Sequence, residues 1–237
     1  MSVYGFDIEI YKEISSGEDW RTISPLGITC AAIVGDDGNN FVFYPGCHYA
    51  LDWRVTPPEP MGQKDLFALA NRLDQLHRQG HTIVTWNGSF DFAVLYDELK
   101  VGDYWSDIVL NHVDPMFEVV CVRGHPVGLD KVAKAMGLPG KPEGMSGALA
   151  PAMWKESPEK RYEVIQYVIQ DSITQRDVYL AIKNAGYLSW TARSGYKRSV
   201  AMKLRTVKEC LALPVLSTPI VPRSNFYDLV LKEFTNG

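Results

Sequence analysis

Two carboxylates, Asp7 and Glu9, lie two residues apart near the start of the chain, within the apolar segment 6–10. Because side chains at positions i and i+2 of a strand point to the same face, a strand here would set both carboxylates side by side. Two charges in apolar surroundings are costly to leave unpaired, and cations would relieve the repulsion. Carboxylate oxygens suit magnesium or manganese rather than zinc. The alternative is a charge pair that blunts an edge strand.

Tyr167 and Asp171 are four residues apart in a segment with helical spacing. This spacing places them on one face of a helix, one turn apart. Asp171 would then join a carboxylate cluster, while the Tyr167 hydroxyl would orient a water held there. A tyrosine has a pKa of about 10 and is a poor base at neutral pH, so a metal would have to lower the pKa of that water. Taken alone, such a pair is common on helices.

A further acid, Asp91, ends the run Asn-Gly-Ser-Phe-Asp at residues 87–91. An acid in the first turn of a helix is stabilised by the helix dipole, so Asp91 alone has a structural explanation. Asp114, which precedes Pro115, likewise fits a helix cap better than a metal ligand. For Asp91, its position within the run at 87–91 favours the chemical role.

In this order, the three segments resemble the motifs of the DEDD 3′–5′ exonucleases, in the branch that carries a tyrosine (DEDDy). The matching residues, motif by motif, are Asp7 and Glu9, then Asn87, Phe90 and Asp91, then Tyr167 and Asp171. The sister branch has a histidine five residues before the last aspartate, where this chain has Gln166. The resemblance covers about residues 3–182. It extends to the proofreading domains of DNA polymerases and is closest to stand-alone polymerase B exonuclease-like proteins.

The resemblance implies a metal-dependent exonuclease that releases nucleoside 5′-monophosphates from the 3′ end of single-stranded nucleic acid, with DNA favoured. Two Mg²⁺ or Mn²⁺ ions about 4 Å apart would clamp the scissile phosphate. Asp7 would bridge both ions, and Glu9 and Asp171 would complete the shell of one. Asp91 would hold the second ion, directly or through water. Tyr167, with Glu9, would position the attacking water.

Two alternatives stay open. One is a 3′–5′ exoribonuclease, since the choice between DNA and RNA depends on how the site treats the 2′-hydroxyl. The other is a nucleic-acid-binding module that keeps the fold without catalysis. The complete set of five catalytic residues argues for an enzyme, which the fold alone would not. No polymerase segment accompanies the motifs, so a polymerase or helicase partner would be a separate chain.

The elements that must position these residues are typical of a mixed α/β fold. Apolar periodicity predicts strands at residues 3–10, 26–34, 41–44, 81–86 and 107–113, and helices at 64–78, 89–99, 129–136 and 158–182. The turn cluster at 35–40 makes a hairpin of the second and third strands. The resemblance implies a ribonuclease H-like mixed sheet with flanking helices, as an exonuclease domain over residues 1–187.

A segment rich in glycine, proline and small residues, 138–151, is predicted to be a mobile loop before the last long helix. It carries Lys141. The loop could close over the site and bring Lys141 to the nucleic acid. The glycines and the position of the loop motivate this hypothesis.

The charge is unevenly distributed. The chain has a net charge of −4, but residues 188–237 hold eight basic and three acidic residues, which leaves an acidic body and a basic extension. Aromatic and basic residues alternate around Trp190, and such a pattern suits single strands. We expect Arg193, Lys197 and Arg198 to contact nucleic acid. The alternatives are a solvated basic surface and a segment that packs on the same domain.

Bulk properties exclude several classes of protein. With 237 residues and 46% hydrophobic content, the chain can bury a sizeable core. It lacks a run of about 18 apolar residues, and hence a membrane span, and its start does not resemble a signal peptide, so we expect a cytoplasmic location. The four cysteines have no zinc-site spacing and are expected to be reduced.

Overall fold

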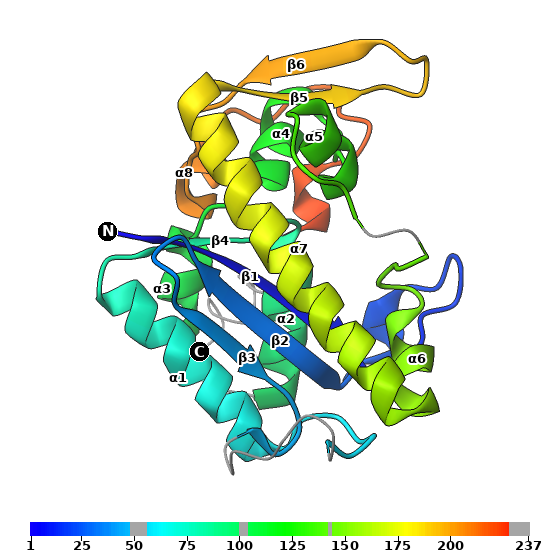
Figure 1. Cartoon of the computed structure of the whole chain (residues 1–237). Coiled ribbons are helices and arrows are strands. Elements are labelled where there is room, and N and C mark those ends of the chain that lie inside the picture. Colours follow the sequence, from blue (N-terminus) through cyan, green and yellow to red (C-terminus); the bar gives the residue numbers. More distant parts are fainter. Residues whose placement is uncertain (48–55, 100–103, 142–143, 228–237) are drawn as a thin grey trace.

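The computed structural model describes residues 1–47, 56–99, 104–141 and 144–227 (Figure 1). Its centre is a four-stranded mixed sheet with the order β3-β2-β1-β4. The strands are β1 (Val3–Ile10), β2 (Ile28–Gly35), β3 (Asn40–Phe43) and β4 (Thr82–Val84). β1 pairs antiparallel with β2 and parallel with β4. It is therefore an interior strand, and its carboxylates do not blunt a sheet edge.

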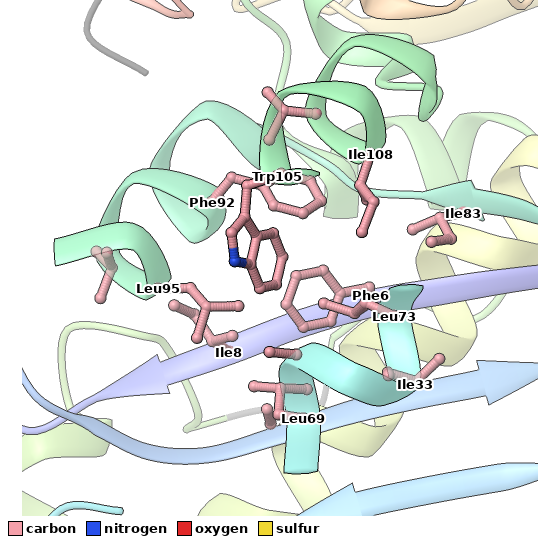
Figure 2. Packing of buried hydrophobic residues seen from close by; sticks show 14 of the residues in the cluster. Phe6, Ile8, Ile33, Leu69, Leu73, Ile83, Phe92, Leu95, Trp105 and Ile108 are labelled. Carbon is pink, nitrogen blue, oxygen red and sulfur yellow. The ribbon is translucent and has the colours of Figure 1, made fainter. Parts of the chain in front are cut away.

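Helices cover both faces of this sheet. On one face, Phe6 and Ile8 of β1 pack against α1 (Gln63–Arg78), α2 (Gly88–Leu99) and α3 (Tyr104–Asn111), as Figure 2 shows. On the other face, α7 (Pro158–Ala185) runs diagonally across the sheet beside α6 (Ala150–Glu156). Because side chains alternate along β1, the apolar residues face α1–α3 and the two carboxylates face α7.

The C-terminal segment packs against the body. It contains the hairpin of β5 (Tyr187–Thr191) and β6 (Lys197–Ala201), then α8 (Val207–Leu211) and a short 3-10 helix, η4 (Arg223–Asn225). The hairpin lies next to α4 (Pro115–Arg123) and α5 (Leu129–Ala135) (Figure 1). Val207 and Tyr227 are buried in the main core. A boundary at residue 187 stays a prediction, and residues 228–237 of the predicted extension lie outside the described residues.

The predicted elements are confirmed in type, with ends shifted by at most three residues, except in two places. The predicted strand at 107–113 is wrong, because that segment lies largely in α3 and only Val113 pairs, through single bridges to Val84 and Thr206. Trp105, Ile108 and Val109 are buried at helical rather than alternating spacing. The predicted loop at 138–151 ends earlier than expected, since α6 begins at Ala150.

Two further expectations concern composition. The four cysteines are free thiols, three of them buried, as predicted. Within the described ranges, no helix has both the length and the apolar character that crossing a bilayer requires.

The close approach of α7 to β1 occurs at Gly5. A Cβ on Gly5 would lie 1.9 Å from the main-chain oxygen of Ser172 on α7. The Ser172 hydroxyl donates to the main-chain oxygens of Ala32 on β2, at 3.1 Å, and of Val168, at 2.9 Å. Since Asp7 follows Gly5 by two residues on the same face, this approach brings the side chains of α7 beside those of β1.

We expect Gly5→Ala to destabilise the fold strongly. The added methyl group would meet main-chain atoms of α7, which cannot rotate away, so the free energy of unfolding should fall by roughly 3 kcal/mol. Urea denaturation measures this change.

The matched control is Gly62→Ala. Gly62 has a φ of −79° and open space around its Cβ position, so the change should cost less than about 1 kcal/mol. Equal effects of the two substitutions would contradict a steric constraint at Gly5.

Candidate active site

The structure brings all five predicted catalytic residues together. They line one cavity of about 340 Å³. Asp7 and Glu9 come from β1, Asp91 from the first turn of α2, and Tyr167 and Asp171 from α7. The predicted nucleic-acid contacts Asn87, Phe90 and Lys141 line the same cavity. Arg193, Lys197 and Arg198 do not.

α7 presents a polar face to β1. Tyr167, Asp171 and Gln175 are spaced at four-residue intervals along it and are all buried. The Gln175 Nε2 group donates to Oδ1 of Asp7 at 2.8 Å, which fixes the Asp7 carboxylate. The sequence analysis missed Gln175, although its position one turn after Asp171 placed it on the same helix face.

Asp91 approaches β1 from α2. Its Oδ1 atom accepts a hydrogen bond from the main-chain N–H of Ile8 at 3.3 Å. Ile8 lies between Asp7 and Glu9, so this bond places the third carboxylate beside the pair. Asp91 is 5% exposed.

The turn that precedes Asp91 is held by Asp114. Asn87 has a φ of 70°, in the left-handed region. The Asp114 carboxylate accepts from the main-chain N–H groups of Asn87, at 3.3 Å, and Gly88, at 3.0 Å. It also caps α4 through the N–H of Phe117 and accepts from the Tyr227 hydroxyl. The predicted helix cap at Asp114 is therefore confirmed, and the sequence had not shown that it also holds this turn.

Burial and repulsion by neighbouring charges raise the pKa values of Asp7, Glu9 and Asp91. Burial, with the charges of Asp91, Asp171 and Glu9, holds the pKa of Asp7 well above its usual range. Burial, and then the charge of Asp171, raises the pKa of Glu9 to about 8. Burial is also the main reason that the pKa of Asp91 is raised to about 8. The cavity therefore binds protons or other cations strongly near neutral pH.

Lys141 provides one such cation. Its Nζ atom lies 2.5 Å from Oδ2 of Asp171 and 2.5 Å from the Tyr167 hydroxyl. Burial would lower the pKa of Lys141, but the charge of Asp171 and these two hydrogen bonds outweigh it and raise that pKa. Asp130, at the start of α5, accepts from the main-chain N–H of Lys141 at 2.8 Å. The lysine is thus tethered at its main chain and bonded at its tip.

The donor set suits a hard divalent cation. Of the residues that the structure describes, four carboxylates and no thiol or imidazole line the cavity. The Oδ1 atom of Asp171 is buried and has no hydrogen-bond partner within the described ranges. In the described part of the chain, no three acidic, histidine or cysteine side chains form an assembled metal site. We therefore expect cation binding to require that Lys141 release Asp171.

Comparisons with known proteins agree with this fold. A family model described as the RNase H superfamily matches residues 36–182, which include Asp91, Tyr167 and Asp171 but not Asp7 or Glu9. A family B DNA polymerase from the hyperthermophilic archaeon Pyrobaculum calidifontis has a similar structure, with a TM-score of 0.55 and 18% identity. The match covers 78% of this chain but 25% of the polymerase chain. No curated protein matched. The predicted ribonuclease H-like fold is confirmed.

Metal-free protein is expected to lose stability as the pH rises from about 6.5 to about 8. Folded Glu9 and Asp91 keep a proton up to a pKa of about 8, whereas unfolded carboxyl groups release theirs near pH ~4. The folded state then binds more protons, so the free energy of unfolding falls by at most about 1.4 kcal/mol per pH unit for each group. His112, whose pKa burial lowers to about 4, opposes this trend only below pH 6.5. Urea unfolding in EDTA measures the slope.

Asp91→Asn should flatten this slope by removing one titrating group, while Glu59→Gln, at an exposed position before α1, should leave it unchanged. Manganese should raise the unfolding midpoint more at pH 8 than at pH 6.5, because cations and protons compete for the same oxygens. A metal-free slope that is flat or rising in this window would contradict protonated carboxyls.

Proposed function

We propose, for a chain that belongs to the RNase H superfamily, the function of a metal-dependent 3′–5′ exonuclease acting on single-stranded DNA. The observation that carries this proposal is the convergence of the three motifs in one cavity. Asp7, Glu9 and Asp91 meet Tyr167 and Asp171 there, although the motifs lie on three different elements. A binding module without catalysis would not require four carboxylates beside one another, three of them buried.

The four carboxylates are the groups that would hold two Mg²⁺ or Mn²⁺ ions. When bound, such ions neutralise charge on the scissile phosphate and lower the pKa of the attacking water. Asp7 and Glu9 project from an interior strand, and Asp171 from a helix locked against that strand. These ligands would therefore be held with little loss of conformational entropy on binding.

The reaction would be hydrolysis of the last phosphodiester bond. The water oxygen forms a bond to phosphorus, and the bond from phosphorus to the 3′ oxygen of the penultimate nucleotide breaks. That 3′ oxygen takes up a proton, and the product is a nucleoside 5′-monophosphate. Tyr167 would orient the water with Glu9. Burial, and then the charge of Asp171, raises the pKa of Tyr167, so its hydroxyl stays protonated and cannot act as the base.

The remaining wall of the cavity suits the terminal nucleotide. Ile10, Ile14, Trp86 and Phe90 supply apolar surface against which a base would stack. Lys141, once released from Asp171, would carry its positive charge to the phosphate. The Asn87 side chain lies on the same wall and offers an amide to the sugar or base.

We expect the protein to shorten 5′-labelled single-stranded DNA from its 3′ end in the presence of manganese or magnesium. EDTA should abolish the ladder. Asp7→Ala should lower the rate by roughly 10³-fold, the scale of losing a principal electrostatic contact. Gel analysis of DNA and of RNA with the same sequence measures the activity and the preferred sugar.

Asp107→Ala, which removes an exposed carboxylate from α3, is the matched control and should cut at the wild-type rate. Faster shortening of RNA than of DNA would replace the proposed substrate with RNA. Binding of both strands without shortening of either would contradict the exonuclease.

Tyr167→Phe should lower kcat by about 10²-fold with little change in KM, because the hydroxyl positions the water but does not bind the strand. The measurement is steady-state trimming of single-stranded DNA. Tyr162→Phe, on the exposed side of the same helix, serves as the control. A rise in KM at constant kcat would instead show that Tyr167 binds substrate.

A further inference from the structure

A second cavity, of about 590 Å³, lies between the β5–β6 hairpin and the segment that joins α4 to α5. Four cations line it: Arg123, Lys131, Arg193 and Arg198. Among the described residues, no acidic side chain lines it. All four side chains are exposed, and among the residues that the structure describes none of the four forms an ion pair. We call this the basic cavity.

The basic cavity also contains an aromatic ring. Trp190 on β5 lies directly opposite Arg198 on β6, so both side chains stand on the same face of the hairpin. The Trp190 ring meets His125 edge to face, with 5.8 Å between the ring centres. Lys197, one residue before Arg198, points to the other face and is not part of the lining. Of the three hairpin residues predicted to contact nucleic acid, Arg193 and Arg198 line the cavity and Lys197 does not.

Two contacts join the basic cavity to the acidic one. The indole N–H of Trp86, which lines the acidic cavity, donates to the main-chain oxygen of Val127, which lines the basic cavity, at 2.9 Å. Asp130, whose side chain holds the main chain of Lys141, is the neighbour of Lys131. The two cavities are therefore neighbours, with Trp86 on the acidic side and Val127 on the basic side of the wall between them.

The opposite charges of the two cavities indicate what the basic cavity binds. A polyanion gains little attraction from a cavity that holds four carboxylates, in a chain whose net charge is −4. Lys141 and bound ions would act on the terminal phosphate alone, so affinity for the rest of the strand must come from cations elsewhere on the protein. Exposed arginines around a half-buried indole match the chemistry of a single strand, whose phosphates pair with cations and whose bases stack on rings.

We propose that the basic cavity binds the phosphates and one base of single-stranded nucleic acid, upstream of a 3′ end held in the acidic cavity. This proposal rests on the exonuclease function and extends it to the rest of the substrate strand. Arg123 and Arg198 hold phosphates, Trp190 stacks on a base, and the strand passes over the wall formed by Trp86 and Val127.

The test compares two double variants that each remove two cations. Arg123→Ala/Arg198→Ala removes two charges from the basic cavity, and Lys183→Ala/Lys208→Ala removes two exposed charges outside it. Fluorescence anisotropy with a long unstructured DNA in EDTA gives the Kd as a function of salt. Each phosphate contact contributes about 0.7 to the salt slope for single strands, so the first variant should lose about 1.4 and the control should match the wild type.

Cleavage separates this proposal from the exonuclease itself. A dinucleotide has one phosphodiester, the scissile one, and leaves no phosphate for the basic cavity. The ratio of kcat/KM on the long strand to that on the dinucleotide should therefore fall by about 10-fold in Arg123→Ala/Arg198→Ala. Trp190→Ala should lower the same ratio to a similar degree. Circular dichroism and melting confirm that each variant is folded.

Equal Kd values and salt slopes for the two double variants would overturn the proposal. An equal loss of affinity for duplex and for single strands in the cavity variant would overturn the single-strand assignment. Wild-type protein that cuts neither substrate would refute the exonuclease. In that case a selective loss of strand binding in the cavity variant would still establish the basic cavity as a nucleic-acid site.

Discussion

The contact between Gly5 and Ser172 is the constraint on which the site depends. A strand and a helix can come this close only where one of them has no side chain, and Gly5 supplies that position. Once α7 lies against β1, its face with Asp171 must meet the strand face with Asp7, because both patterns are fixed by their periods. The packing of α7 on β1 therefore brings the carboxylates of the two elements together. The Ser172 hydroxyl also bonds the helix to β2.

Placing these carboxylates together lowers the free energy of unfolding, and this explains which groups surround them. The Lys141 ammonium bonded to Asp171 relieves part of the repulsion between the carboxylates, and their raised pKa values favour protonation, which relieves more. Both of these cations can exchange. A permanent salt bridge from a second helix would stabilise the fold but would block divalent ions. A lysine on a loop, tethered through Asp130, can leave without disturbing the packing of α7.

The sequence predicted the parts of the site that depend on local spacing. The pair on β1 and the i, i+4 pair on α7 follow from strand and helix periods, and the family motifs supplied their order. Local spacing failed at residues 107–113, where a short apolar run is ambiguous and burial at positions 105, 108 and 109 shows a helix. It also could not show that Arg123 and Arg198, far apart in the chain, share a cavity. Such contacts depend on tertiary packing, which a single sequence does not encode in a local pattern.

The end of β4 connects the two cavities of opposite charge. β4 pairs in parallel with β1, so the chain leaves the sheet beside the carboxylates and turns at Asn87 into α2, which carries Asp91. Trp86, just before this turn, donates instead toward Val127 and the basic cavity. A site that must hold divalent cations is necessarily acidic, and a polyanionic substrate is necessarily repelled by it. The basic cavity, to which the Trp86 indole is bonded, resolves this conflict. It attracts one part of the strand, while the carboxylates and their ions act on another part.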